Sequence, residues 1–239
     1  AQALAWIMEA GRGVAVCGTH GKTTTTSMIS RVLVDGGYDP TFLVGGELND
    51  LGSNARRGAG EFVVCEADES DGSLLYLSPE VAVLTNMELD HHSHYRHVED
   101  VEDVFRRFLE RLPAHGLLVY CGEDQRVKRL AGRVERRACS YGFSDHDDYQ
   151  ARAIVGEHPG SGFEIWGRGT FLARADLQVP GRHNVLNALA CFATLHELGV
   201  PAHVISASLH SFGGAVRRFQ MKGCKDGVTV VDDYAHHPT

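Results

Sequence analysis

Residues 14–37 constrain the fold more than any other part of the chain. They begin with an apolar run, residues 14–17, that is typical of a buried strand. A loop with glycine at positions 18 and 21 follows, and then an amphipathic segment predicts a helix that runs to a pair of glycines. A strand, a glycine loop and a helix in succession indicate a phosphate cradle, because the loop N–H groups and the positive helix end face one spot.

The residues that open this helix favour a nucleotide as the ligand. Lys22 adds a mobile positive charge, and Thr23 places a hydroxyl where a phosphate-bound Mg²⁺ would lie. The loop is two residues shorter than the general G-x-x-x-x-G-K-[ST] pattern, which would need glycine where the chain has Val16. An ordinary tight turn before a helix is the alternative. The preceding strand and the run of four threonines favour nucleotide binding.

Polar residues follow two further apolar runs, residues 62–65 and 81–85. Glu66 opens the acidic run E-A-D-E-S-D after the first, and His91 lies in N-M-E-L-D-H-H after the second. The carboxyl ends of parallel strands meet at one edge of a sheet, so we expect both near the cradle. Glu66 would hold Mg²⁺ against the phosphates, and one histidine of the second segment would meet a second Mg²⁺.

Each of these metal assignments has an alternative. The acidic run could be a solvated loop, although four acids directly after a buried strand favour a cation. The four histidines between 91 and 97 suggest structural zinc, but no cysteine lies near them and their spacing is not H-E-x-x-H. We therefore favour magnesium at both places.

Strands alternating with helices, such as those expected at 98–112 and 127–134, predict an α/β fold. The expected architecture is a doubly wound, mainly parallel sheet with helices on both faces. Short segments between about 140 and 180, separated by glycine, proline and serine, predict a small antiparallel meander. We expect one domain over residues 1–218 and the start of another at 219–239. The first ten residues read as a helix without a start of its own, which suggests a preceding domain.

A second candidate binding segment is P-G-R-H-N-V-L-N-A-L-A, which we expect to lead into a helix after residue 184. Asn184 and Asn187 lie on one face of that helix, and their amides could read an adenine edge. Helix capping by Asn184 explains the segment equally well. Arg218 could clamp a phosphate or belong to a solvated linker, and spacing alone gives Asp233 no role.

Bulk properties exclude several classes of partner. The net charge of −8, without basic clusters among aromatic residues, argues against nucleic acid. No run of about 18 apolar residues exists that could span a membrane. Six scattered cysteines without a C-x-x-C pair indicate buried reduced thiols, and hence a cytoplasmic protein.

Five motifs, taken in order, resemble those of the Mur ligases of bacterial peptidoglycan synthesis: GTHGKTTTT, EADESDGS, TNMELDHH, PGRHNVLNALA and DDYAHHPT. The resemblance covers nearly the whole chain, and the short phosphate loop is the form that this family uses. It implies an ATP-dependent amide ligase that works through an acyl phosphate. The chain would be the central ATP-binding domain with the first strand of a third domain, and an N-terminal UDP-binding domain would be absent.

The resemblance also implies roles for individual residues. The ATP phosphates would bind to Gly18, Thr19, His20, Gly21, Lys22, Thr23 and Thr24. Thr23 and Glu66 would hold the first Mg²⁺ and His91 the second, so that Lys22, Glu66 and His91 form the catalytic set. The adenine would lie against His183, Asn184 and Asn187, with Asp233 at the ribose and Arg218 at the phosphates.

Within the family, the chain is most similar to the branch that joins L-alanine to UDP-N-acetylmuramate. Residues 92–112 contain no lysine, whereas many sister ligases carry a carbamylated lysine there. The branch that recycles a tripeptide is the alternative, although it typically has tyrosine where this chain has Ser70. A folylpolyglutamate-type ligase, or a nucleotide-binding module without ligation activity, are the further alternatives.

Overall fold

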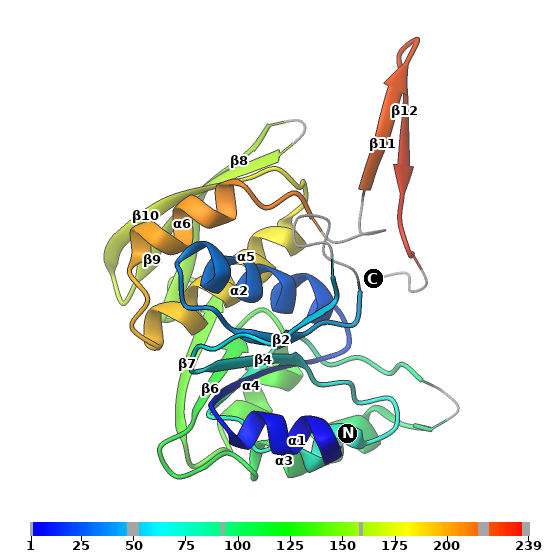
Figure 1. Ribbon diagram of the computed structural model, residues 1–239, viewed down its shortest axis with the longest axis vertical. Helices are drawn as coiled ribbons and strands as arrows, with labels where there is room; N and C mark the ends of the chain where they lie inside the picture. Colours follow the sequence, from blue (N-terminus) through cyan, green and yellow to red (C-terminus); the bar gives the residue numbers. More distant parts are fainter. Residues whose placement is uncertain (1, 47–52, 92–93, 158–159, 215–219, 236–239) are drawn as a thin grey trace.

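Ten strands of the computed structural model form one sheet (Figure 1). The structure describes residues 2–46, 53–91, 94–157, 160–214 and 220–235. The strands of the sheet are β1 (Arg12–Cys17), β2 (Thr41–Leu43), β3 (Ala55–Arg56), β4 (Phe62–Glu66), β5 (Val81–Leu84), β6 (Leu117–Cys121), β7 (Arg137–Gly142), β8 (Tyr149–Glu157), β9 (Gly160–Gly167) and β10 (Thr170–Leu177). Their order is β10-β9-β8-β7-β6-β5-β1-β4-β2-β3. Each neighbouring pair from β8 to β2 is parallel, and β3, β9 and β10 pair antiparallel.

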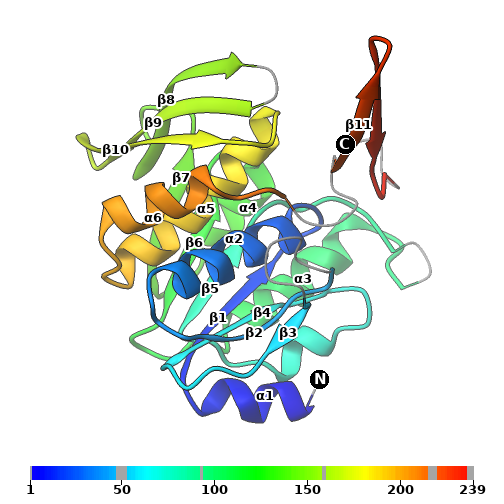
Figure 2. The same cartoon turned by 45° about the horizontal axis from the view of Figure 1, so that its top comes forward.

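Helices cover both faces of this sheet (Figures 1 and 2). They are α1 (Gln2–Glu9), α2 (Lys22–Asp35), α3 (Val98–Leu109), α4 (Gln125–Ala131), α5 (Arg182–Glu197) and α6 (Ala202–His210), with a 3-10 turn, η1, at Ser73–Tyr76. Helices α2, α5 and α6 lie on one face, and α1, α3 and α4 lie on the other. The predicted doubly wound, mainly parallel sheet is confirmed. None of the described helices is both long and apolar enough to cross a membrane.

The side chains of β1 explain why it reads as an unbroken apolar run. Val14 and Val16 pack into the core beneath α2 and α5, whereas Ala15 and Cys17 pack into the opposite core with α3. Successive residues of a strand point to opposite faces, so a strand with helices on both sides needs apolar residues throughout.

The predicted meander is confirmed as β8, β9 and β10, and it continues the main sheet because β8 pairs in parallel with β7. Strand β7 was not predicted as a separate element. Its sequence, R-A-C-S-Y-G, begins with exposed residues and lacks the apolar run of the central strands. Its place beside β6 depends on long-range pairing rather than on local pattern.

One sequence-based boundary was wrong, and one strand was missed. Helix α5 begins at Arg182, because Gly181 (φ +100°) occupies the N-cap position, so Asn184 lies inside the first turn and does not cap the helix. The expected strand near 228 is β12 (Val228–Asp232), but it pairs with an unpredicted strand, β11 (Gln220–Lys225). This hairpin projects from the rest of the molecule (Figure 2). The boundary predicted at 218/219 lies outside the described residues.

Candidate active site

Three loops meet at one edge of the sheet because β5, β1 and β4 are neighbours. Residues 18–21 follow β1, residues 67–72 follow β4, and residues 85–91 follow β5. All three strands run parallel, so their carboxyl ends open on the same side, where ligands bind in sheets of this kind. The structure therefore brings together the glycine loop, the acidic run and the histidine segment, as expected from the sequence.

The loop after β5 fixes the shape of the glycine loop. The backbone N–H of His20 donates to Asn86 Oδ1 at 2.7 Å, and Asn86 Nδ2 donates back to the His20 carbonyl at 3.0 Å. The Thr85 hydroxyl donates to the same carbonyl at 2.6 Å. Thr19 is held in a similar way, since its hydroxyl accepts from the Glu88 N–H at 2.9 Å. Thr85, Asn86 and Glu88 were not predicted from the sequence as site residues.

Helix α2 begins directly at this loop without a side-chain cap. Gly21 is the N-cap residue, with a left-handed backbone at φ +81°, and the first helical hydrogen bond joins Thr25 N–H to the Gly21 carbonyl. The first-turn N–H groups have no partner within the helix itself, and the helix dipole adds partial positive charge there. This arrangement suits an anion such as a nucleotide phosphate.

Lys22 lies buried at the start of α2 and points to an acid. Its Nζ donates to Glu69 Oε2 at 2.8 Å and to the Thr19 carbonyl at 3.4 Å. Both side chains of this ion pair are almost fully shielded from solvent. The sequence predicts that Lys22 binds phosphate, and Glu69 was not predicted as a site residue.

Only one oxygen of the Glu69 carboxylate is satisfied. Glu69 is 1% exposed, and its Oε1 has no hydrogen-bond partner among the residues that the structure describes. His91 Nε2 lies 3.7 Å from that oxygen. Desolvation by burial raises the pKa of Glu69, and the charge of Lys22 opposes this shift. A buried carboxylate oxygen without a partner is costly and indicates a place for a ligand.

Glu66 lies over the first turn of α2, as predicted. The Thr23 hydroxyl donates to its carboxylate at 3.0 and 3.1 Å, and the Gly45 N–H donates to Oε2 at 2.9 Å. A hydroxyl and a carboxylate side by side at the end of a phosphate cradle are oxygen ligands suited to Mg²⁺. These two residues fit the first metal assigned from the sequence.

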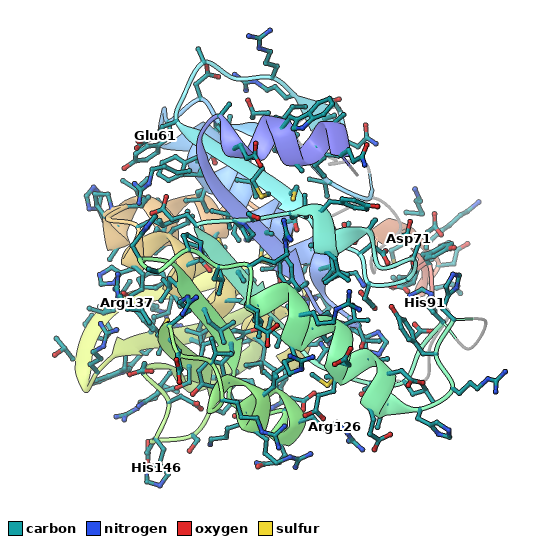
Figure 3. The ribbon with its side chains drawn as sticks, turned by 90° about the horizontal axis from the view of Figure 1, so that it is seen from below. Glu61, Asp71, His91, Arg126, Arg137 and His146 are labelled. Carbon is teal, nitrogen blue, oxygen red and sulfur yellow. The ribbon has the colours of Figure 1, made fainter. Side chains whose placement is uncertain are left out.

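A second set of ligand atoms lies beside the first. The atoms offered by Asp68, Glu69 and His91 all fall within 4.8 Å of one another. His91 has a left-handed backbone, φ +54°, and its side chain lies on the same side of the molecule as Asp71 in Figure 3. Two carboxylates and an imidazole are suitable ligands for a divalent cation. One of the carboxylate oxygens, Glu69 Oε1, has no hydrogen-bond partner among the described residues and is available to bind it.

The asparagines of α5 lie directly behind the glycine loop. Thr25 donates to Asn187 Oδ1 at 3.3 Å, and Asn187 Nδ2 donates to Asn184 Oδ1 at 3.3 Å. Asn184 Nδ2 in turn donates to the Pro180 carbonyl at 2.7 Å. The pair therefore connects α5 to the helix that carries Lys22.

The remaining predicted site residues are His183, Asp233, Arg218 and Thr24. His183 is the second residue of α5, where burial lowers its pKa and the Asp233 carboxylate acts in the opposite direction. The tail after β12 therefore lies close enough to α5 for the two side chains to interact. Arg218 lies outside the described residues. Thr24 is buried in the first turn of α2.

A family model described as the Mur ligase middle domain matches residues 16–195. The UDP-N-acetylmuramate–L-alanine ligase of Geobacter sulfurreducens is 48% identical over 239 residues, which is 100% of this chain and 52% of that protein. The chain spans about half the length of the curated relatives it matches.

Solved structures agree with this family match. The UDP-N-acetylmuramate–alanine ligase of Thermotoga maritima superposes with a TM-score of 0.85 at 30% identity, covering 98% of this chain and 53% of that one. The UDP-N-acetylmuramate:L-alanyl-gamma-D-glutamyl-meso-diaminopimelate ligase of Neisseria meningitides gives a TM-score of 0.79 at 29% identity, covering 88% and 69%.

Proposed function

The chain belongs to the Mur ligase family, and we propose that it is the ATP-binding domain of a ligase that joins L-alanine to UDP-N-acetylmuramate. The observation that carries this proposal is the uncapped start of α2 with Lys22 in its first turn. An identity of 48% to a relative named for this reaction supports the choice of substrates.

In this proposal the site neutralises charge rather than moving protons. The first-turn N–H groups of α2 and the Lys22 ammonium bind the phosphates of ATP, which lowers the cost of charge that develops during phosphoryl transfer. The carboxylate of UDP-N-acetylmuramate attacks the γ-phosphorus of ATP, displaces ADP and forms an acyl phosphate. The amino group of L-alanine then attacks the carbonyl carbon, releases inorganic phosphate and loses a proton as the amide forms.

The acidic residues complete the phosphate site. Thr23 and Glu66 would hold one Mg²⁺ and His91 a second, with Glu69 and Asp68 close enough to His91 to share it. When bound, Mg²⁺ supplies positive charge that screens the phosphates from one another. The separate hydrogen bonds of Glu66 to Thr23 and Gly45 keep its carboxylate aimed at the first turn of α2.

The other nucleotide contacts stay part of the proposal. His183, Asn184 and Asn187 would face the adenine, Asp233 the ribose and Arg218 the phosphates. The asparagine amides are already bonded to each other and to Thr25, so in this role they would also keep α5 at a fixed distance from the cradle. We place the reaction in the cytoplasm, which agrees with five of the six cysteines being buried as free thiols.

A phosphate-release assay tests the choice of substrates. We expect a longer protein, extended to the length of the curated relatives, to release phosphate from ATP only when both UDP-N-acetylmuramate and L-alanine are present. The 239-residue chain alone is expected to bind ATP without forming the amide, because it spans 52% of such relatives. The same assay with the tripeptide L-alanyl-γ-D-glutamyl-diaminopimelate in place of L-alanine is the matched control.

Two results would contradict the proposal. Faster phosphate release with the tripeptide than with L-alanine would assign the protein to the recycling branch, as in the Neisseria relative. Amide formation by the 239-residue chain itself would show that the proposed division into domains is wrong.

A further inference from the structure

The ion pair between Lys22 and Glu69 poses a problem for nucleotide binding. The same ammonium that should contact phosphate is already paired with a buried carboxylate at 2.8 Å. Phosphate and Glu69 are both anions and compete for one cation. Nucleotide binding through Lys22 must therefore break the pair or bring a second negative charge beside it.

Burial makes this exchange costly. The side chains of Lys22 and Glu69 are 8% and 2% exposed, so water cannot replace the lost partner of either group. Removing one member of a buried ion pair leaves the other charge uncompensated, which is strongly unfavourable. The Tyr95 hydroxyl donates to the Glu69 backbone carbonyl, which ties the acid in place when its side chain loses Lys22.

A cation could take over the carboxylate that Lys22 leaves. Glu69 Oε1 already lacks a hydrogen-bond partner among the described residues and lies 3.7 Å from His91 Nε2. Asp68 offers a further oxygen within the same 4.8 Å group. A divalent ion bound there would compensate the charge of Glu69 at the moment when Lys22 turns to the phosphates.

We propose that Glu69 is a positioning residue that holds Lys22 in the nucleotide-free protein and exchanges it for a divalent cation when nucleotide binds. This inference rests on the proposed nucleotide-binding function and adds a coupling to it. Metal and nucleotide favour each other because each compensates one half of the separated pair. Without metal, Glu69 is a competitor of the phosphates.

The test measures the affinity for ADP in excess EDTA and in excess Mg²⁺, by calorimetry, for wild type and for Glu69→Gln. The glutamine has nearly the same shape and no charge, so Lys22 is free for phosphate without metal. We expect ADP to bind about tenfold more tightly to Glu69→Gln than to wild type in EDTA. The ratio of the two dissociation constants, EDTA over Mg²⁺, is expected to fall by at least about tenfold.

Asp71→Asn is the matched control. Asp71 is an exposed acid in the same loop, and its carboxylate accepts from the Ser73 N–H, which the asparagine oxygen still allows. The substitution Asp71→Asn removes one negative charge, as Glu69→Gln does, but at a residue that does not pair with Lys22. We expect its two dissociation constants to stay within about twofold of wild type.

Three outcomes would overturn the inference. An unchanged EDTA-to-Mg²⁺ ratio in Glu69→Gln, with both affinities lowered alike, would mean that Glu69 only supports the fold. An equal gain of ADP affinity in EDTA by Asp71→Asn would mean that the net charge of the loop, and not the Lys22–Glu69 pair, governs the affinity. No saturable ADP binding by wild type in either condition would overturn the proposed function itself, and this inference with it.

Discussion

Lys22→Ala is expected to lower the free energy of unfolding by about 3–5 kcal/mol at neutral pH, in the absence of any nucleotide. The reason is that the substitution leaves Glu69 charged, buried and without its cation. Denaturant unfolding followed by circular dichroism measures the loss. The double variant Lys22→Ala/Glu69→Gln is expected to recover most of it, because no buried charge remains.

The stability that Lys22→Ala loses is expected to depend on pH. Burial raises the folded-state pKa of Glu69 above its ordinary value, and Lys22 opposes that shift, so its removal raises the pKa further. A carboxyl with a raised folded pKa destabilises the protein as pH rises through that pKa. The difference between variant and wild type is therefore expected to shrink as the pH is lowered toward about 4, near the unfolded pKa of a glutamate. Additive effects of the two substitutions, or a loss that does not change with pH, would contradict the buried pair.

Gly18→Ala is expected to destabilise the protein by about 3 kcal/mol or more and to abolish measurable nucleotide binding. Gly18 has φ +125°, and an added Cβ would lie 2.2 Å from the Thr85 hydroxyl and 3.0 Å from the backbone of Asn86. The side chain would force apart the two segments that shape the phosphate loop. Unfolding and ATP titration both report this effect.

Gly199→Ala separates backbone strain from crowding. Gly199 also has a left-handed backbone, φ +90°, but an added Cβ would meet nothing within 4 Å. Backbone strain alone predicts that Gly199→Ala lowers the free energy of unfolding by about 1–2 kcal/mol and leaves the ATP affinity unchanged. If Gly18→Ala bound ATP as well as Gly199→Ala does, the close approach of the loop to Thr85 would not matter for the site.

The central sheet was predictable from sequence for a simple physical reason. Strands buried on both faces, such as β1 and β5, need apolar residues throughout, and polar residues must then gather at their ends. This local pattern is enough to locate Lys22, Glu66 and His91 at one edge of the sheet. Strand β7 escaped prediction because its sequence is partly polar and its pairing with β6 is long-range. Strand β11 escaped because its sequence, Q-M-K-G-C-K, has no apolar run.

Sequence patterns could not identify Glu69 as the partner of Lys22. The acidic run as a whole predicts a cation site, and Glu66 was the predicted ligand because it is adjacent to the strand. Glu69 is buried because the chain turns after β4, where Tyr95 donates to its carbonyl, and no local pattern encodes that contact. The sequence does show several acids in the run that follows β4. They indicate that some acid pairs with Lys22, but they do not identify which one.

The most direct test of the account is a calorimetric titration of the 239-residue chain with ATP and Mg²⁺, wild type against Lys22→Ala. The variant is measured at a temperature where circular dichroism shows it folded. We predict saturable, Mg²⁺-dependent binding to wild type and at least about a hundredfold weaker binding to the variant, because it lacks the charge that contacts the phosphates. Equal binding to both proteins would contradict the claim that the start of α2 is the phosphate site.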